Sequence, residues 1–349
     1  MSRRLVVVLV AGLALVVGGL TAWRLAQPET ELAGALSLTA ADVDRVSWTD
    51  WAAVRRELGA DLDADSSAEE VRTFLDEAFG ADLGAMTALV SSAPTLQQAF
   101  GFSPATLEWE AFAQSAEGAV DLMKVVDEVS FDEIADRLEG LGYQRPEDDD
   151  GVWVGGPDVV SGIDGSLTPE LQHVALLADE HLVLTSDLAP FLEQALAVAR
   201  GDGDTADDLA ELATDLGEPL SAAVYDGAHA CEKLAMSQAD DDAVAEADQL
   251  VAAAGGVHPL TGFAMARLAG GVVRVVMQVE DEDDAAADAD ARAALAAGPA
   301  PGQGGDFSDR FSVAGAAATG REITLDLRPE AGEYVLSDLT SGPVLFATC

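Results

Sequence analysis

The chain has 349 residues, of which 63 are acidic and 18 are lysine or arginine, so its formal net charge is −45. Hydrophobic residues make up 49% of the sequence, which is ordinary for a globular protein and excludes a disordered polyelectrolyte. A surface this negative repels phosphate backbones, so nucleic acid is excluded as a partner. Asparagine is absent and lysine occurs only at Lys124 and Lys233, which is typical of a GC-rich genome, although salt adaptation would also enrich aspartate.

The N-terminus carries the clearest signal. Arg3 and Arg4 precede an uncharged apolar run over residues 5–23, which begins at Leu5 and ends at Trp23. Such a run spans roughly 28 Å as a helix, close to the hydrocarbon thickness of a bilayer. The two arginines favour a cytoplasmic N-terminus and an exported body, with the lipid bilayer as a partner. The alternative is a cleaved signal peptide and a secreted protein.

We predict that residues 5–23 remain in the mature protein and hold it in the membrane fraction, because the apolar run is long and lacks a good cleavage site. Mass spectrometry of the mature N-terminus, after separation of membranes from soluble proteins, checks this expectation. A mature N-terminus near residue 20 or 23 in the soluble fraction would instead show cleavage.

The exported body divides into a tether over residues 24–43, a first half over 44–205 and a second half over 206–349. In the first half we expect helices at 50–58, 68–79, 130–141 and 188–200. Strands are expected at 107–113, 119–126, 152–154, 173–177 and 181–185. Trp48 and Trp51 lie three residues apart around the first helix, and we interpret them as packing residues rather than a binding platform.

The second half repeats this order of elements. Strands are expected at 261–268, 271–279, 311–317, 322–327 and 344–347, with a helix at 285–297. A shift of the sequence from Gly118 to Gly271 superimposes the apolar pattern of one strand pair and its helix on the other. The predicted fold class is therefore α+β, with antiparallel sheets covered by helices on one face and two diverged repeats.

Cys231 and Cys349 are the two cysteines of the chain. An exported chain with two cysteines permits one intramolecular bridge, and disulfides persist in oxidising compartments. We therefore predict a Cys231–Cys349 disulfide. Two unrelated thiols are the alternative, because the sequence does not reveal their proximity.

We assign no catalytic, cofactor-binding or metal-ligating residue. The chain lacks a Walker A loop, a His-Glu-x-x-His pair and a Gly-x-Ser-x-Gly elbow. One Gly-x-Gly-x-x-Ala run, at 201–206, follows a predicted helix and carries aspartates that would repel a dinucleotide. His173 and His181 border a predicted hairpin whose register places His173 opposite Ser186, away from His181.

Acidic clusters occur at 147–150, 202–208, 240–242 and 280–284. Carboxylate oxygens are calcium ligands, but the clusters lack EF-hand spacing. We interpret them as solvated surfaces that accumulate cations diffusely.

The overall plan and the segment 176–196 (LLADEHLVLTSDLAPFLEQAL) resemble predicted single-pass membrane-anchored extracytoplasmic proteins of high-GC bacteria, a group without an assigned function. The resemblance carries no catalytic residue across. The expected function is an extracytoplasmic, membrane-anchored binding or envelope-associated interaction protein with an envelope protein as a possible partner. The alternatives are an exported hydrolase that uses an unlocalised carboxylate site and a cation-dependent adhesion or sensor domain.

Overall fold

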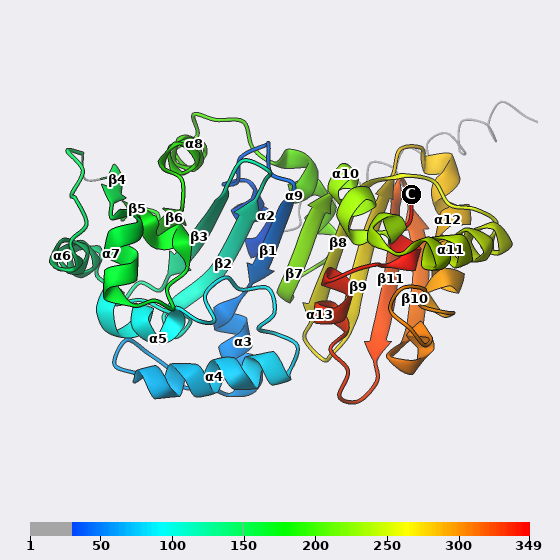
Figure 1. The fold of residues 1–349 in the computed structure, drawn as a ribbon, viewed down its shortest axis with the longest axis horizontal. Coiled ribbons are helices and arrows are strands. Elements are labelled where there is room, and N and C mark those ends of the chain that lie inside the picture. Colours follow the sequence, from blue (N-terminus) through cyan, green and yellow to red (C-terminus); the bar gives the residue numbers. More distant parts are fainter. Residues whose placement is uncertain (1–29, 149) are drawn as a thin grey trace, which may run out of the picture.

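A single antiparallel sheet of eleven strands runs through the computed structural model, which describes residues 30–148 and 150–349 (Figure 1). The strand order from one edge to the other is β10-β11-β9-β8-β7-β1-β2-β3-β6-β5-β4. The predicted membrane anchor from Leu5 to Trp23 lies outside the described residues. Among the helices that are described, none has the length and apolar character needed to cross a bilayer. The antiparallel α+β class predicted from the sequence is confirmed.

Each half of the chain contributes one side of this sheet. The first half supplies β1 (Arg45–Thr49), β2 (Leu107–Gln114), β3 (Ala119–Val125), β4 (Val152–Val154), β5 (His173–Leu177) and β6 (Leu182–Ser186). The second half supplies β7 (Pro219–Asp226), β8 (Leu260–Leu268), β9 (Val273–Val279), β10 (Phe311–Thr319) and β11 (Glu322–Pro329).

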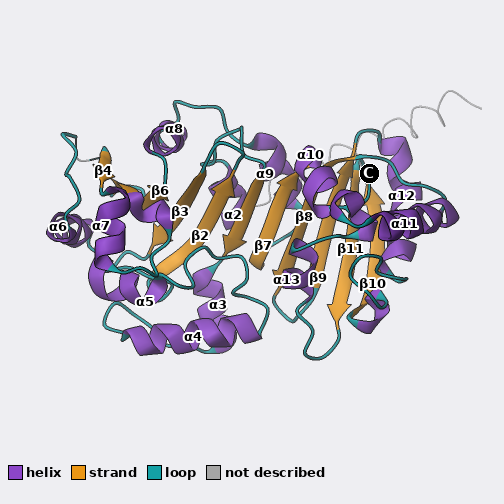
Figure 2. Cartoon of the chain, viewed as in Figure 1, coloured by secondary structure: helices purple, strands orange, loops and turns teal. Residues whose placement is uncertain are grey.

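Helices and short helical turns connect the strands (Figure 2). The first half contains α2 (Glu31–Leu36), α3 (Trp51–Leu58), α4 (Ala68–Gly80), α5 (Ala93–Thr95), η1 (Leu96–Phe100), α6 (Phe131–Leu141), α7 (Gly156–Ile163), η2 (Pro169–Gln172) and α8 (Ala189–Ala199). The second half contains α9 (Asp207–Thr214), α10 (Gly227–His229), η3 (Ala230–Leu234), η4 (Met236–Gln238), α11 (Asp241–Ala254), α12 (Glu282–Ala296), η5 (Phe307–Asp309), α13 (Val335–Thr340) and η6 (Leu345–Ala347).

The two halves meet where β1 pairs antiparallel with β7, and Ser47 lies opposite Ala223 in this pairing. Outward from the junction, the first half runs β1-β2-β3-β6-β5 and the second half runs β7-β8-β9-β11-β10. Leu107 opens β2 and Leu260 opens β8, 153 residues later (260 − 107). The sheet therefore has an internal pseudo-two-fold arrangement centred on the Ser47–Ala223 pair.

Helices cover both faces of the sheet, so the expectation of helices on one face is wrong. We name the two faces after Trp48 and Glu110, whose side chains point to opposite sides because strand residues alternate. On the Trp48 face, α2, α8 and α9 pack over one core that includes strands of both halves. On the Glu110 face, α3, α4, α6 and α7 cover a first-half core, whereas α11, α12 and α13 cover a second-half core. Central strands such as β3 bury side chains on both faces, which is why one helical layer is not enough.

Three local predictions are also corrected. Part of the expected tether forms α2, and its Leu32 and Leu36 are fully buried, so this segment belongs to the body. The helix predicted at 50–58 begins at Trp51, and Asp50 caps it by accepting a hydrogen bond from the amide of Ala53 at 2.7 Å. The predicted strand at 344–347 contains the turn η6.

Trp48 and Trp51 are both buried, which confirms their interpretation as packing residues. Trp48 lies in β1 and packs against Trp109, with ring centroids 5.3 Å apart. Trp51 begins α3 and packs edge-on against Phe74 of α4. The two indoles therefore contribute to cores on opposite faces of the sheet, rather than to one surface.

Residues 82–89, between α4 and α5, tie the two halves together on the Glu110 face. Asp82 accepts hydrogen bonds from the amides of Leu336 and Ser337, at the start of α13, over 2.7 and 3.1 Å. Met86 packs in the second-half core, whereas Leu89 packs in the first-half core. The segment thus spans the junction and contacts both sides of it.

The buried Glu110 of β2 anchors this segment. Its carboxylate accepts hydrogen bonds from the Thr87 hydroxyl at 2.6 Å and the Ala88 amide at 2.8 Å. It also accepts one from Trp51 Nε1 at 2.9 Å. Burial raises the pKa of Glu110 to about 7, and these hydrogen bonds oppose the rise because they favour the charged form.

Asp121 of β3 is a second buried carboxyl group on the same face. Both of its oxygens, and the hydroxyl of Thr185 directly opposite in β6, have no hydrogen-bond partner among the described residues. Burial raises the pKa of Asp121 well above its usual range, and the carboxylates of Glu110 and Glu170 raise it further. The sheet therefore contains a buried acidic pair next to the junction of the halves.

We predict that the protein becomes less stable as the pH rises from about 4.5 to about 7, the interval between the unfolded and folded pKa values of Glu110. The folded state holds the Glu110 proton up to about pH 7, whereas the unfolded state releases it near 4.5, so the folded state is favoured below that window and loses this advantage as Glu110 ionises. The loss attributable to Glu110 reaches up to about 3 kcal/mol, at 1.36 kcal/mol per pKa unit.

Urea unfolding at several pH values measures this effect. Glu110→Gln should flatten the pH dependence, whereas Asp136→Asn, at an exposed position of α6, should leave it unchanged. Equal pH slopes for the Glu110→Gln variant and the wild type would contradict the assignment.

Candidate functional site

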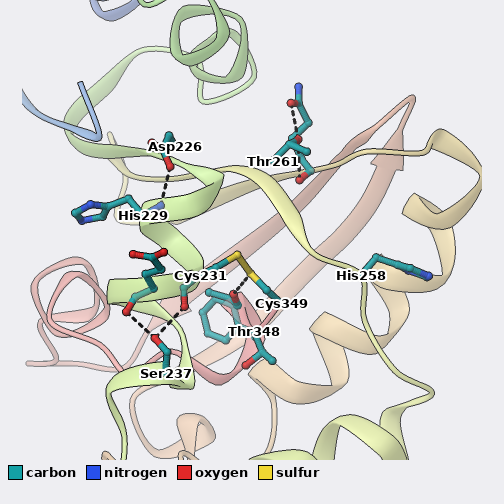
Figure 3. Close-up of a disulfide and its surroundings, with 12 residues drawn as sticks. Asp226, His229, Cys231, Ser237, His258, Thr261, Thr348 and Cys349 are labelled. Atoms are coloured by element: carbon teal, nitrogen blue, oxygen red, sulfur yellow. Dashed lines mark hydrogen bonds between the residues drawn. A yellow bond between two sulfur atoms is a disulfide. The ribbon is translucent and has the colours of Figure 1, made fainter. Parts of the chain in front are cut away.

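The predicted disulfide is confirmed, because Cys231 of η3 and Cys349 are bonded, with their Cα atoms 5.7 Å apart and a sequence separation of 118 (Figure 3). The bridge holds residues 344–349 against the second-half core, where Phe346 packs on Phe307 and Phe311. Figure 3 shows the side chains of His229 and His258 on opposite sides of the bridge and directed away from it. The Cys231 sulfur is therefore a structural atom, not a nucleophile beside a histidine.

A buried arginine supports the same C-terminal segment. Arg292 of α12 donates to the carbonyl oxygens of Phe346 and Thr348 over 2.7 and 3.0 Å. Asp288, one turn earlier, pairs with Arg292 at 3.2 Å and with His258 Nδ1 at 2.8 Å. Burial lowers the pKa of Arg292 to about 10, which still leaves it charged at neutral pH. These contacts satisfy a buried charge and fix the segment that the disulfide tethers.

Three of the four acidic clusters lie at helix N-termini. Asp240 caps α11 and Asp281 caps α12 by accepting hydrogen bonds from main-chain amides. Asp207 and Asp208 occupy the first turn of α9. Negative charge is favoured there because it faces the positive end of the helix dipole. Within the described parts of the chain, no three histidine, cysteine or acidic side chains converge on a possible metal position.

The two histidines and the glycine-containing run that the sequence analysis considered do not form one site. Each is a local feature of the fold. His173 lies opposite Ser186 in the β5–β6 ladder, as predicted, and His181 lies in the turn of that hairpin. The glycine-containing run at 201–206 links α8 to α9 and follows no strand. It therefore lacks the strand-to-helix context of a dinucleotide site.

A cavity of about 370 Å³ opens where the two halves meet near the end of α4. Its walls come from three segments: the end of α4, the β8–β9 turn and the loop between β11 and α13. The lining residues are Gly80, Ala81, Arg267, Gly270, Gly271, Val272, Arg328, Pro329, Glu330, Ala331, Gly332 and Glu333. Because both halves contribute walls, the cavity depends on their fixed arrangement.

Two arginines give this cavity its chemical character. Neither Arg267 nor Arg328 has a carboxylate partner within 4 Å among the residues that the structure describes. Arg267 makes one long hydrogen bond, 3.4 Å, to the carbonyl of Leu268, and partial burial lowers its pKa. Arg328 is exposed. Glu330 and Glu333 line the same cavity, and Asp82 and Glu57 act on Arg267 electrostatically. The guanidinium group of Arg267 nevertheless has no carboxylate within 4 Å among the described residues, so it can still bind an external carboxylate or phosphate.

Local backbone geometry allows Arg267 to reach the cavity. Gly271 has a φ of 95°, and a Cβ atom at this position would lie 3.1 Å from Nη1 of Arg267. A side chain at residue 271 would therefore be strained and would crowd the guanidinium group. Glycine in the β8–β9 turn keeps this wall of the cavity open.

An exposed aromatic pair adjoins the cavity. Phe79 is 58% exposed and Tyr334 is 37% exposed, and their ring centroids are 5.7 Å apart. Phe79 precedes Gly80, and Tyr334 follows Glu333, so each ring is next in sequence to a lining residue. One ring comes from each half of the chain. Large apolar side chains on a strongly charged surface are typical of recognition sites.

The arrangement suits binding of an anion. A guanidinium group donates several hydrogen bonds in one plane, which matches a carboxylate or a phosphate. Among the lining residues there is no serine, threonine, cysteine, histidine or tyrosine. The sequence prediction missed Arg267 and Arg328, because nothing in the sequence marks an arginine that will lack a carboxylate partner.

A second cavity has a volume of about 330 Å³. It lies beside the N-terminus of α9 and is lined by Asp207, Asp208 and Asp226 together with apolar residues such as Leu209 and Leu212. Asp226 accepts a hydrogen bond from the amide of His229 (Figure 3). These carboxylates belong to helix starts, so the cavity adds to the general negative potential of this surface.

No family model matches the chain, and no curated protein matches it. Two solved structures of TP0453 align with it. Crystal form I has a TM-score of 0.43 and 7% sequence identity, and the alignment covers 89% of this chain and 97% of that chain. Crystal form III has a TM-score of 0.42 and 9% identity, with 88% and 97% covered. Similarity at this level transfers neither function nor site residues.

We predict that the Cys231–Cys349 bridge stabilises the protein by about 2–4 kcal/mol, because it closes a long loop in the unfolded chain. Replacing both cysteines by serine should lower the free energy of unfolding by that amount. Dithiothreitol should lower the melting temperature of the wild type and leave the double variant unchanged. Free-thiol labelling of both cysteines in unreduced exported protein would contradict the bridge.

Proposed function

We propose that the protein is an extracytoplasmic binding protein, anchored in the membrane by residues 5–23, that recognises an anionic group through the arginine-lined cavity. The observation that carries this proposal is Arg267, which lines the cavity, makes one long hydrogen bond and has no carboxylate within 4 Å among the described residues, in a chain with a net charge of −45. Arg328 lines the same cavity, together with Glu330 and Glu333. The apolar N-terminal run supports the anchor, and the disulfide supports an oxidising compartment.

The adjoining aromatic pair narrows the ligand class. Phe79 and Tyr334 offer apolar surface within the same region as the two guanidinium groups. A ligand that uses both would carry a carboxylate or phosphate on an aromatic or apolar body. Such a group could belong to a small molecule or to a side chain of an envelope protein. The internal pseudo-two-fold arrangement further suggests that the two halves derive from a duplication, with the binding cavity formed between them.

The proposal is tested with a panel of aromatic carboxylates and aryl phosphates, each paired with its neutral amide or alcohol. We expect some of the anions to raise the melting temperature and to bind in calorimetry, whereas their neutral counterparts do not. The double variant Arg267→Gln and Arg328→Gln should weaken binding about tenfold or more, because charge-assisted hydrogen bonds are lost.

Arg56→Gln serves as a matched control, because Arg56 is exposed on α3 and does not line the cavity. Like each of the two cavity substitutions, it removes one positive charge, and it should leave binding unchanged. Equal binding of neutral and anionic compounds, or equal affinities of the double variant and the wild type, would overturn the proposal.

A further inference from the structure

The strand β10 forms a free edge of the sheet. Within the described residues β11 is its one pairing partner, and it ends the strand order. The strand reads Phe-Ser-Val-Ala-Gly-Ala-Ala-Ala-Thr and contains no charged residue. Ser312 and residues 314–319 are exposed. An edge of this kind presents main-chain hydrogen-bonding groups to any extended chain that approaches it.

The register shows which main-chain groups face outward. β10 and β11 are joined by a two-residue turn, and Thr319 pairs with Glu322 at its base. The amide of Val279 in β9 donates to the carbonyl of Arg321, so the main-chain groups of Glu322 point toward β10. Antiparallel ladders alternate, so the groups of Thr319 and Ala317 face β11, and those of Ala316 and Ala318 face outward.

The outward-facing segment is also regular. The irregularity in the β10–β11 ladder lies between Val313 and Gly315, and the pairing is continuous from Gly315 to Thr319. Its side chains are small, so they do not obstruct an approaching backbone. This stretch can therefore pair with another strand through its main chain alone.

The opposite edge of the sheet is protected. β4 has three residues, and Gln144 forms an isolated bridge with its Val154, with N–H···O distances of 2.9 and 3.2 Å. Arg145 then lies over the ring of Trp153 in β4. Short length and a covering segment are common means of blocking an edge, as are charged residues and proline. The helix α12 packs against β10, but residues 315–319 remain exposed and include neither a charged residue nor a proline.

We infer that β10 is a docking edge for an extended, neutral or basic segment of a partner polypeptide, which adds to the sheet as a further strand. The negative charge of the protein determines which kind of segment can occupy this edge. A second copy of the chain would bring another net charge of −45 to the interface, and an acidic segment would meet the same repulsion. Main-chain pairing supplies the contacts, and the small side chains of β10 leave the sequence of the occupant largely free.

This inference rests on the sheet edge and is independent of the arginine-lined cavity. The probe is a short capped peptide in which threonine and valine alternate between two terminal lysines, labelled for fluorescence anisotropy. We expect it to bind the wild-type protein saturably. Ala318→Pro removes one outward amide without breaking the ladder to β11, and it should weaken binding about tenfold or more. Ala318→Ser keeps the amide and should bind like the wild type.

A second peptide keeps the test independent of the fold of the proline variant. Methylation of alternate peptide nitrogens on the pairing edge should abolish binding to the wild type. Equal binding by the Ala318→Pro variant, or by the methylated peptide, would overturn the inference. A peptide with terminal glutamates that binds as tightly would overturn the charge selection. Sedimentation that shows a dimer which the proline variant loses would identify a second copy as the occupant and overturn the partner assignment.

Discussion

The antiparallel pairing of β1 with β7 is the contact on which the rest of the structure depends. It turns two half-sheets into one and places Ser47 opposite Ala223 at the centre. Once the strands are joined, the core on the Trp48 face extends across the junction, from Leu192 of α8 to Leu212 of α9. A ladder of main-chain hydrogen bonds has little tolerance for sliding, because a shift by one residue exchanges the two faces. The position of every element in one half relative to the other follows from this pairing.

On the Glu110 face, polar contacts rather than a continuous apolar core hold the halves together. Glu110 holds the Thr87–Ala88 segment, and Asp82 holds the start of α13. Buried carboxylates cost desolvation energy, and Glu110 is compensated by three donor groups, whereas Asp121 is not. In most proteins the buried polar groups have hydrogen-bond partners. Exceptions occur mainly at functional sites and in moving parts. Here the exception is Asp121 in β3, which is separated from β7 by β1 and β2.

The parts of the fold that the sequence predicted are those with dense apolar runs between clear turns. The β2–β3, β5–β6 and β8–β9 hairpins and the helices α6, α8 and α12 all satisfy that condition. The central strands were missed. β1 has five residues, and the spacing of Trp48 and Trp51 resembles a helical face, while β7 begins at Pro219 and contains Ala222 and Ala223, which favour strands weakly. Their conformation is imposed by pairing with distant strands, and a local pattern does not contain that information.

The candidate site could not be predicted from the sequence for a related reason. Most of the scarce cations with resolved contacts act internally: Arg292 binds main-chain carbonyls and Arg274 pairs with Asp326. Arg267 and Arg328 come from different strands, and only the folded chain shows that both line one cavity. The net charge of −45 repels an anion within about 10 Å of the surface, beyond which salt screens the repulsion, and at contact a guanidinium group attracts the anion. Attraction therefore acts only on a ligand that already fits the cavity, so shape and apolar contact with Phe79 and Tyr334 must contribute before charge does.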